Sequence, residues 1–127
     1  MKTLFTLLAV LISIGANAQT QVKNVDAVAF KKYMEDKKSV LIDLRTNEEI
    51  KSKGIIPGAI QIDYLAKGAE DTIAKLDKTK TYLIYCAGGG RSGECAGLMQ
   101  KLGFKEVINL EKGFGDWKNK GFEIDKK

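Results

Sequence analysis

Hydrophobic residues along the chain form continuous runs that alternate with segments in which apolar and polar positions are mixed. The runs at 39–45, 81–86 and 106–110 are rich in β-branched and aliphatic residues, which is typical of strands covered on both faces. Residues 55–63 contain the only proline and predict a turn followed by a short strand. Strands that alternate with helices indicate an α/β domain with a largely parallel sheet.

The remaining segments predict five helices. The first covers residues 24–38 and has Asp26 as a plausible N-cap. Its buried side is expected to comprise Val28, Phe30, Tyr33 and Met34. The second helix is expected to follow the N-cap Thr46 and to end near Gly54. Three further helices are predicted within residues 68–77, 91–104 and 113–122.

The first 18 residues differ in character from the rest of the chain. Lys2 precedes an apolar run at 4–14, and the small residues Ala16 and Ala18 follow. This order is typical of a cleavable secretory signal. The run is too short to span a membrane as a helix, and it lacks the polar face of an amphipathic helix. We therefore predict cleavage after Ala18, export, and one domain over residues 19–127.

The amino-acid composition bears on nucleic-acid binding, on catalysis by histidine and on metal binding. The 21 Lys and Arg residues exceed the 16 Asp and Glu residues, but the lysines are spread along the chain, which favours a solvated surface over a nucleic-acid interface. The sequence has no histidine, which excludes catalytic triads built on imidazole and removes the commonest metal ligand. Two cysteines nine residues apart do not make a zinc site, so we expect no metal and no cofactor.

The candidate chemistry lies where the strand at 81–86 ends. Cys86 closes this strand, and a glycine-rich loop then leads into a predicted helix. The loop residues are Ala87, Gly88, Gly89, Gly90, Arg91 and Ser92. Glycines allow consecutive N–H groups to turn inward, and the start of a helix adds its positive end. We predict an anion pocket that holds Cys86 as a thiolate, which is the reactive form of a cysteine.

The same glycines permit a second interpretation. Residues 88–93 satisfy the G-x-G-x-x-G pattern of dinucleotide-binding loops. A run of glycines satisfies many patterns by chance, and a domain of this size has little room for a second nucleotide-binding half and a substrate domain. The thiolate pocket is therefore the favoured interpretation.

The second cysteine, Cys95, lies one turn into the predicted helix after the loop. We expect it to be an inert, packed thiol. The alternative is that Cys95 pairs with Cys86 under oxidising conditions, because exported proteins tolerate disulfides.

Two charged residues end the strand at 39–45. The carboxyl ends of parallel strands lie at one edge of a sheet, so Asp43 and Arg45 could converge with Cys86 there. A structural pair that shapes the loop is the favoured role for Asp43 and Arg45.

Four stretches in a fixed order, spread over residues 39–121, resemble the motifs of the rhodanese family. They are LIDLR with Glu49, GIIPGAIQI, YCAGGGRS and LEKGFGDWKNKGF. The resemblance implies a rhodanese-like α/β fold, with a five-stranded, mainly parallel sheet flanked by helices on both faces. It also implies a single-domain sulfurtransferase of the exported, periplasmic type, which nothing in the sequence requires to be more than a monomer.

The resemblance further implies a mechanism. Cys86 would take a sulfane sulfur from an anionic donor (thiosulfate, a persulfide or a polysulfide) and pass the sulfur to cyanide or a thiol. The loop amides would hold the persulfide, while Asp43 and Arg45 would brace the site, with Glu49 as the partner of Arg45. Cys86 and Arg91 enclose four residues, as in the sulfurtransferases, whereas the related dual-specificity phosphatases enclose five.

A rhodanese-like module that binds sulfur species or a protein partner without turnover is the alternative function. The intact cysteine and arginine favour the enzyme. Several positions depart from the family motifs: Ile55 replaces a frequent histidine, Ile50 a frequent aromatic residue, and Lys112 a glycine. Ala87 stands where many thiosulfate-using members carry a basic residue, which lowers the positive potential at the mouth of the loop.

Overall fold

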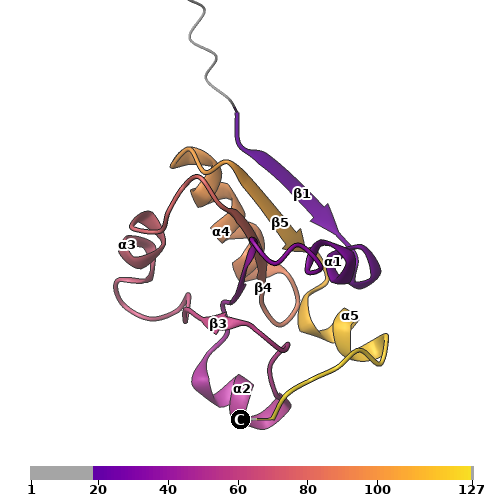
Figure 1. Ribbon diagram of the computed structural model, residues 1–127. Helices are drawn as coiled ribbons and strands as arrows, with labels where there is room; N and C mark the ends of the chain where they lie inside the picture. The colour runs from indigo at the N-terminus through magenta and orange to yellow at the C-terminus, as the bar shows by residue number, and fades with distance from the viewer. Residues whose placement is uncertain (1–18, 127) are drawn as a thin grey trace, which may run out of the picture.

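In the computed structural model, which describes residues 19–126, all neighbouring strands of the sheet are parallel. The five strands are arranged in the order β1-β5-β4-β2-β3 (Figure 1). They are β1 (Gln21–Val25), β2 (Val40–Asp43), β3 (Ile60–Gln61), β4 (Thr81–Tyr85) and β5 (Glu106–Leu110). The α/β class and the parallel sheet expected from the sequence are confirmed.

Helices pack on both faces of this sheet, so each face contributes to a separate hydrophobic cluster (Figure 1). One cluster contains buried residues of α3 and α4, and the other contains buried residues of α1 and α5. The helices are α1 (Ala27–Tyr33), α2 (Asn47–Lys53), α3 (Ala69–Ala74), α4 (Gly90–Lys101) and α5 (Gly113–Asn119). This three-layer arrangement explains why the central strands are apolar on both faces.

Strand β1 was missed in the sequence. It pairs with β5 along its whole length, from Gln21 opposite Glu106 to Val25 opposite Leu110. Its five residues are exposed or half-buried because it is an edge strand. The sequence signal was therefore weak, and the prediction that a helix begins at residue 24 was wrong, because α1 begins only at Ala27.

Helix α1 confirms the predicted N-cap but corrects the predicted buried side. The Asp26 side chain accepts a hydrogen bond from the Ala29 N–H at 2.9 Å. Ala27 and Phe30 are buried, while the Val28 side chain, expected in the core, is 45% exposed. Residues three apart share a face of a helix, so a helix that buries positions 27 and 30 turns position 28 toward solvent.

The described residues carry no helix with the length and apolar composition that crossing a membrane requires. The predicted signal at 1–18 lies outside residues 19–126.

The contrast on α1 gives a stability prediction. The Phe30 ring makes edge-to-face contacts with Tyr85 and Trp117, at centroid distances of 6.4 Å each. We expect Phe30→Ala to lower the free energy of unfolding by about 3–5 kcal/mol, since it leaves a cavity between helices and sheet. The exposed Val28→Ala should change it by less than about 0.5 kcal/mol. Urea unfolding measures both variants, and equal losses would contradict the assignment of the buried face.

Candidate active site

The glycine-rich loop lies between the end of β4 and the start of α4, at the carboxyl edge of the sheet (Figure 1). Cys86 directly follows Tyr85, the last residue of β4, and its side chain belongs to the cluster on the α3–α4 face. The side chain is 1% exposed. The thiol therefore lies at the carboxyl edge of the parallel sheet, where α/β proteins commonly have their ligand-binding sites.

Main-chain amides surround the Cys86 sulfur as predicted. Sγ accepts hydrogen bonds from the N–H of Gly89 at 3.1 Å and from the N–H of Ser92 at 3.4 Å. The thiol also forms a hydrogen bond of 3.5 Å with the Ser92 hydroxyl oxygen, and this hydroxyl can donate to the sulfur once the thiol is ionised. The loop thus provides a built-in pocket for one anionic sulfur.

Two opposing effects set the acidity of Cys86. Burial raises the pKa of the thiol, because a thiolate loses its hydration in the interior. Hydrogen bonds from the Ser92 side chain and from the amides of Ser92, Gly89 and Gly88 favour the thiolate, so that the pKa of Cys86 is lowered overall. A lowered pKa in a hydrogen-bonded pocket is typical of reactive cysteines.

The loop is held from its other side by the start of α5. The Phe114 N–H donates to the carbonyl oxygen of Cys86 at 2.8 Å, and the Gly115 N–H donates to that of Ala87 at 3.3 Å. These bonds fix two peptide planes at the beginning of the loop. The amides that face the sulfur therefore depend on a segment more than twenty residues away in sequence.

Two glycines make this close approach between segments possible. Gly89 has φ 105°, and a Cβ there would overlap the Glu111 carbonyl oxygen. Gly113 has φ 68°, and a Cβ there would overlap the Ala87 carbonyl oxygen. Both positions therefore need glycine. Lys112, by contrast, has φ −97°, so its replacement of a glycine carries no backbone strain.

Asp43 and Arg45 pair with each other at the end of β2, and neither has a hydrogen bond to the Cys86 sulfur. The Arg45 guanidinium donates to the Asp43 carboxylate through Nε at 3.1 Å and Nη2 at 2.8 Å. Nη2 also donates to the Gly54 carbonyl at 2.6 Å. The Tyr85 hydroxyl donates to Asp43 as well. Both charged side chains are buried.

Asp43, Arg45 and Cys86 share the carboxyl edge of the sheet, as predicted, but their contacts lie on opposite faces of the sheet. Tyr85 and Phe114 belong to the cluster on the α1–α5 face, whereas Cys86 belongs to the opposite cluster. The Arg45 guanidinium lies 4.0 Å from the centre of the Phe114 ring, and the Phe114 N–H binds the Cys86 carbonyl. Arg45 therefore acts on the loop through α5, as a structural brace.

Glu49 pairs with Arg91, which corrects the expectation that it pairs with Arg45. Arg91 Nη1 and Nη2 donate to Glu49 Oε1 and Oε2 at 2.6 and 2.9 Å, a bidentate arrangement. Arg45 is already occupied by Asp43 and Gly54, and Glu49 lies at the more exposed start of α2. The hydrogen bond from Arg91 is the main reason that the pKa of Glu49 falls to about 2.

Cys95 is a fully buried free thiol in α4, and its expected packing is confirmed. Burial raises the pKa of Cys95 to about 12, so this cysteine stays protonated where Cys86 ionises. Cys86 is likewise a free thiol, and the structure contains no disulfide between the two.

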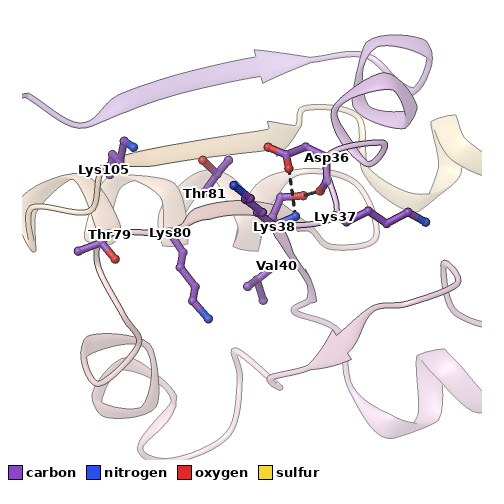
Figure 2. A pocket seen from close by; sticks show the side chains of 9 residues that line it. Asp36, Lys37, Lys38, Val40, Thr79, Lys80, Thr81 and Lys105 are labelled. Carbon is purple, nitrogen blue, oxygen red and sulfur yellow. Dashed lines mark hydrogen bonds between the residues drawn. The ribbon is translucent and has the colours of Figure 1, made fainter.

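Two hollows elsewhere on the described surface contain no cysteine. One of about 620 Å³ is bordered by Val40 and Thr81, the first residues of β2 and β4, at the opposite edge of the sheet (Figure 2). Its lysines are Lys37, Lys38, Lys80 and Lys105. A separate hollow of about 410 Å³ is also lined by four lysines. Because lysines border both, we interpret them as solvated surface.

Within residues 19–126, the structure brings together no group of three His, Cys, Asp or Glu side chains that could hold a metal. The reactive group that the site presents is the Cys86 thiol, whose sulfur accepts hydrogen bonds from two loop amides.

Comparisons with known proteins agree with this geometry. The family model described as "Rhodanese-like domain" matches residues 26–120. A protein of Allochromatium vinosum named "Sulfurtransferase" is 33% identical over 105 residues, which cover 81% of this chain and 94% of that protein. The crystal structure of a rhodanese-like domain protein from Staphylococcus aureus is 32% identical, with a TM-score of 0.66, and the match covers 81% of this chain and 98% of the other.

The fold itself extends to more distant structures. A rhodanese-related protein from Thermoplasma volcanium matches with a TM-score of 0.71 at 22% identity, covering 83% of this chain and 99% of the other. At this identity the likeness concerns the fold alone.

The Ser92 hydroxyl should be needed for the acidity of Cys86. In a Cys95→Ser background, we expect Ser92→Ala to shift the pH profile of iodoacetamide alkylation to higher pH, because the thiolate loses a hydrogen bond. The rate near neutral pH should fall roughly threefold to tenfold. The matched control is Ser52→Ala, an exposed serine on α2, which should leave the profile unchanged. Identical profiles for all three proteins would refute the assignment.

The buried pair gives a second prediction for this site. Asp43→Asn leaves the Arg45 charge buried without a counter-ion, so we expect the free energy of unfolding to fall by about 3–5 kcal/mol. Lys23→Ala breaks the exposed pair between Lys23 and Glu106, whose charged atoms are 3.7 Å apart, and should cost less than about 1 kcal/mol. Thermal and urea unfolding compare the two, and a mild effect of Asp43→Asn would show that the pair is not a brace.

Proposed function

The chain belongs to the rhodanese-like domain family, and from this premise we propose that it is a sulfurtransferase that carries sulfane sulfur on Cys86. The observation that carries the proposal is the Sγ atom held by the amides of Gly89 and Ser92. A relative 33% identical to this chain bears the name sulfurtransferase, which supports the same reaction class.

The first half-reaction loads the cysteine. The Cys86 thiolate attacks the outer sulfur of the donor, a new S–S bond forms, and the S–S bond of the donor breaks. With thiosulfate the leaving group is sulfite, and with a persulfide or polysulfide it is a thiolate or a shorter polysulfide. The electron pair of the broken bond departs with the leaving group, so Cys86 is left as a persulfide and no external oxidant or reductant is needed.

The second half-reaction returns the site to its starting state. Cyanide or a thiolate attacks the outer sulfur of the persulfide, the Cys86–sulfur bond breaks, and the Cys86 thiolate leaves. The pocket amides stabilise the anionic sulfur at the beginning and end of the cycle, which is the role of preorganised donors. Because the cysteine enters and leaves as a thiolate, the reaction needs no imidazole base, in keeping with a sequence without histidine.

Mass spectrometry of the intact protein tests the proposal. Incubation with thiosulfate, and separately with a hydropersulfide or polysulfide, should add the mass of one sulfur atom to the protein. Cyanide should remove this atom. Cys86→Ser should abolish the adduct, because it removes the nucleophile, whereas Cys95→Ser should retain it, because Cys95 is buried and protonated.

The competing function, a rhodanese-like module that binds without turnover, predicts a different result. Such a module would show no sulfur adduct on Cys86 with any donor, and that outcome would overturn the proposed enzyme.

A further inference from the structure

We propose that the Glu49–Arg91 ion pair makes the Cys86 pocket select persulfide-type donors of low charge, such as hydropersulfides, over dianionic donors such as thiosulfate. This inference rests on the proposed function and names the donor class for the same site. Glu49 is then a specificity-determining residue, although it does not touch the sulfur.

The loop has only one charged side chain to offer an anionic donor. The residues between Cys86 and Ser92 are one alanine, three glycines and Arg91, so Arg91 is the charged residue of the loop. Its guanidinium donates two hydrogen bonds to the Glu49 carboxylate, at 2.6 and 2.9 Å. The positive charge at the mouth is therefore cancelled by a negative charge in direct contact with it.

The ion pair is fixed in place by the start of α2. Glu49 is the third residue of this helix and completes a capping box with Thr46. Glu49 Oε1 accepts hydrogen bonds from the Thr46 N–H at 3.3 Å and from the Thr46 hydroxyl at 3.2 Å. The carboxylate is also favoured by the positive end of the helix. It is thus held toward Arg91 before any donor arrives.

Other negative charges act on the same guanidinium. The pKa of Arg91 is raised first by its hydrogen bond to Glu49, and also by the charges of Glu49, the Cys86 thiolate and Asp63. The charge of Arg91 is therefore already balanced by Glu49 before a donor binds. What remains for an incoming donor is the ring of neutral amides around Sγ, which suits a single anionic sulfur.

The two donor classes place different charges in this pocket. When the thiolate attacks the outer sulfur of a neutral hydropersulfide, RS–SH, the complex carries a single negative charge. A persulfide forms on Cys86, the proton stays on the transferred sulfur, and RS⁻ leaves. When the thiolate attacks thiosulfate, three negative charges meet before sulfite leaves. With the cation already paired, the second complex is the more strongly disfavoured.

Single-turnover loading of Cys86 tests this inference, with the full domain and two donors. The donors are thiosulfate and the hydropersulfide of 2-mercaptoethanol, and the intact mass gives the rate for each. We expect Glu49→Gln to raise the ratio of the thiosulfate rate to the hydropersulfide rate roughly tenfold at low salt, because Arg91 regains its charge. The gain should shrink at high salt. Glutamine is also compatible with a capping box, so the helix start is preserved.

The matched control is Glu48→Gln, which removes the same charge from an exposed position one residue away and should leave both rates unchanged. A second variant adds charge without touching the ion pair: Ala87→Lys places a cation in the half-buried position next to Cys86 and should raise the same ratio. Far-UV circular dichroism and unfolding curves establish that each variant is folded.

The outcomes separate this inference from the proposed function. If sulfur is loaded but neither Glu49→Gln nor Ala87→Lys changes the ratio, the selection by charge is overturned while the sulfurtransferase stands. If Glu48→Gln shifts the ratio as much as Glu49→Gln, the effect is one of general charge and the role of the ion pair is overturned. If no donor loads Cys86 in any of the proteins, the proposed function itself fails.

Discussion

The buried ion pair of Asp43 and Arg45 is the interaction on which the arrangement of the site depends. Two charges removed from water must be fully paired, and here the Tyr85 hydroxyl and the Gly54 carbonyl complete the pairing. These partners belong to β4 and to the end of α2, and the Phe114 ring of α5 covers the guanidinium. One charge pair thereby links three elements that lie around the loop of Cys86.

The loop stabilises a negative charge on a sulfur atom that is buried. A thiol that is hidden from solvent would normally resist ionisation, as Cys95 does. Cys86 is equally hidden, but its sulfur meets amides from its own loop. The two cysteines lie in the same hydrophobic cluster, but only the pKa of Cys86 is lowered by hydrogen bonds, from the Ser92 side chain and the loop amides.

Most of the fold was predictable because its elements carry strong local signals. The central strands are continuous apolar runs, and the caps at Asp26 and Thr46 follow simple rules. Strand β1 was not predictable in this way, because its five residues are exposed or half-buried and the strand is defined by its pairing with β5. Among site residues, the pairing of Asp43 with Arg45 was predicted, since residues two apart on a strand share a face, and the structure confirms it. Only the assignment of Glu49 to Arg45 was wrong. The pairing of Glu49 with Arg91 joins segments far apart in sequence, and only the tertiary structure reveals it.

The close approach between the loop and the start of α5 bears on how this site can be transplanted or redesigned. The carbonyl groups of Cys86 and Ala87 are oriented by amides of Phe114 and Gly115, and Gly89 clears the backbone of Glu111. The functional unit is therefore discontinuous: residues 86–92 together with residues 111–115. A graft of the loop alone onto another parallel sheet would carry the cysteine but lose the amides of Phe114 and Gly115, which hold the first two carbonyl groups of the loop.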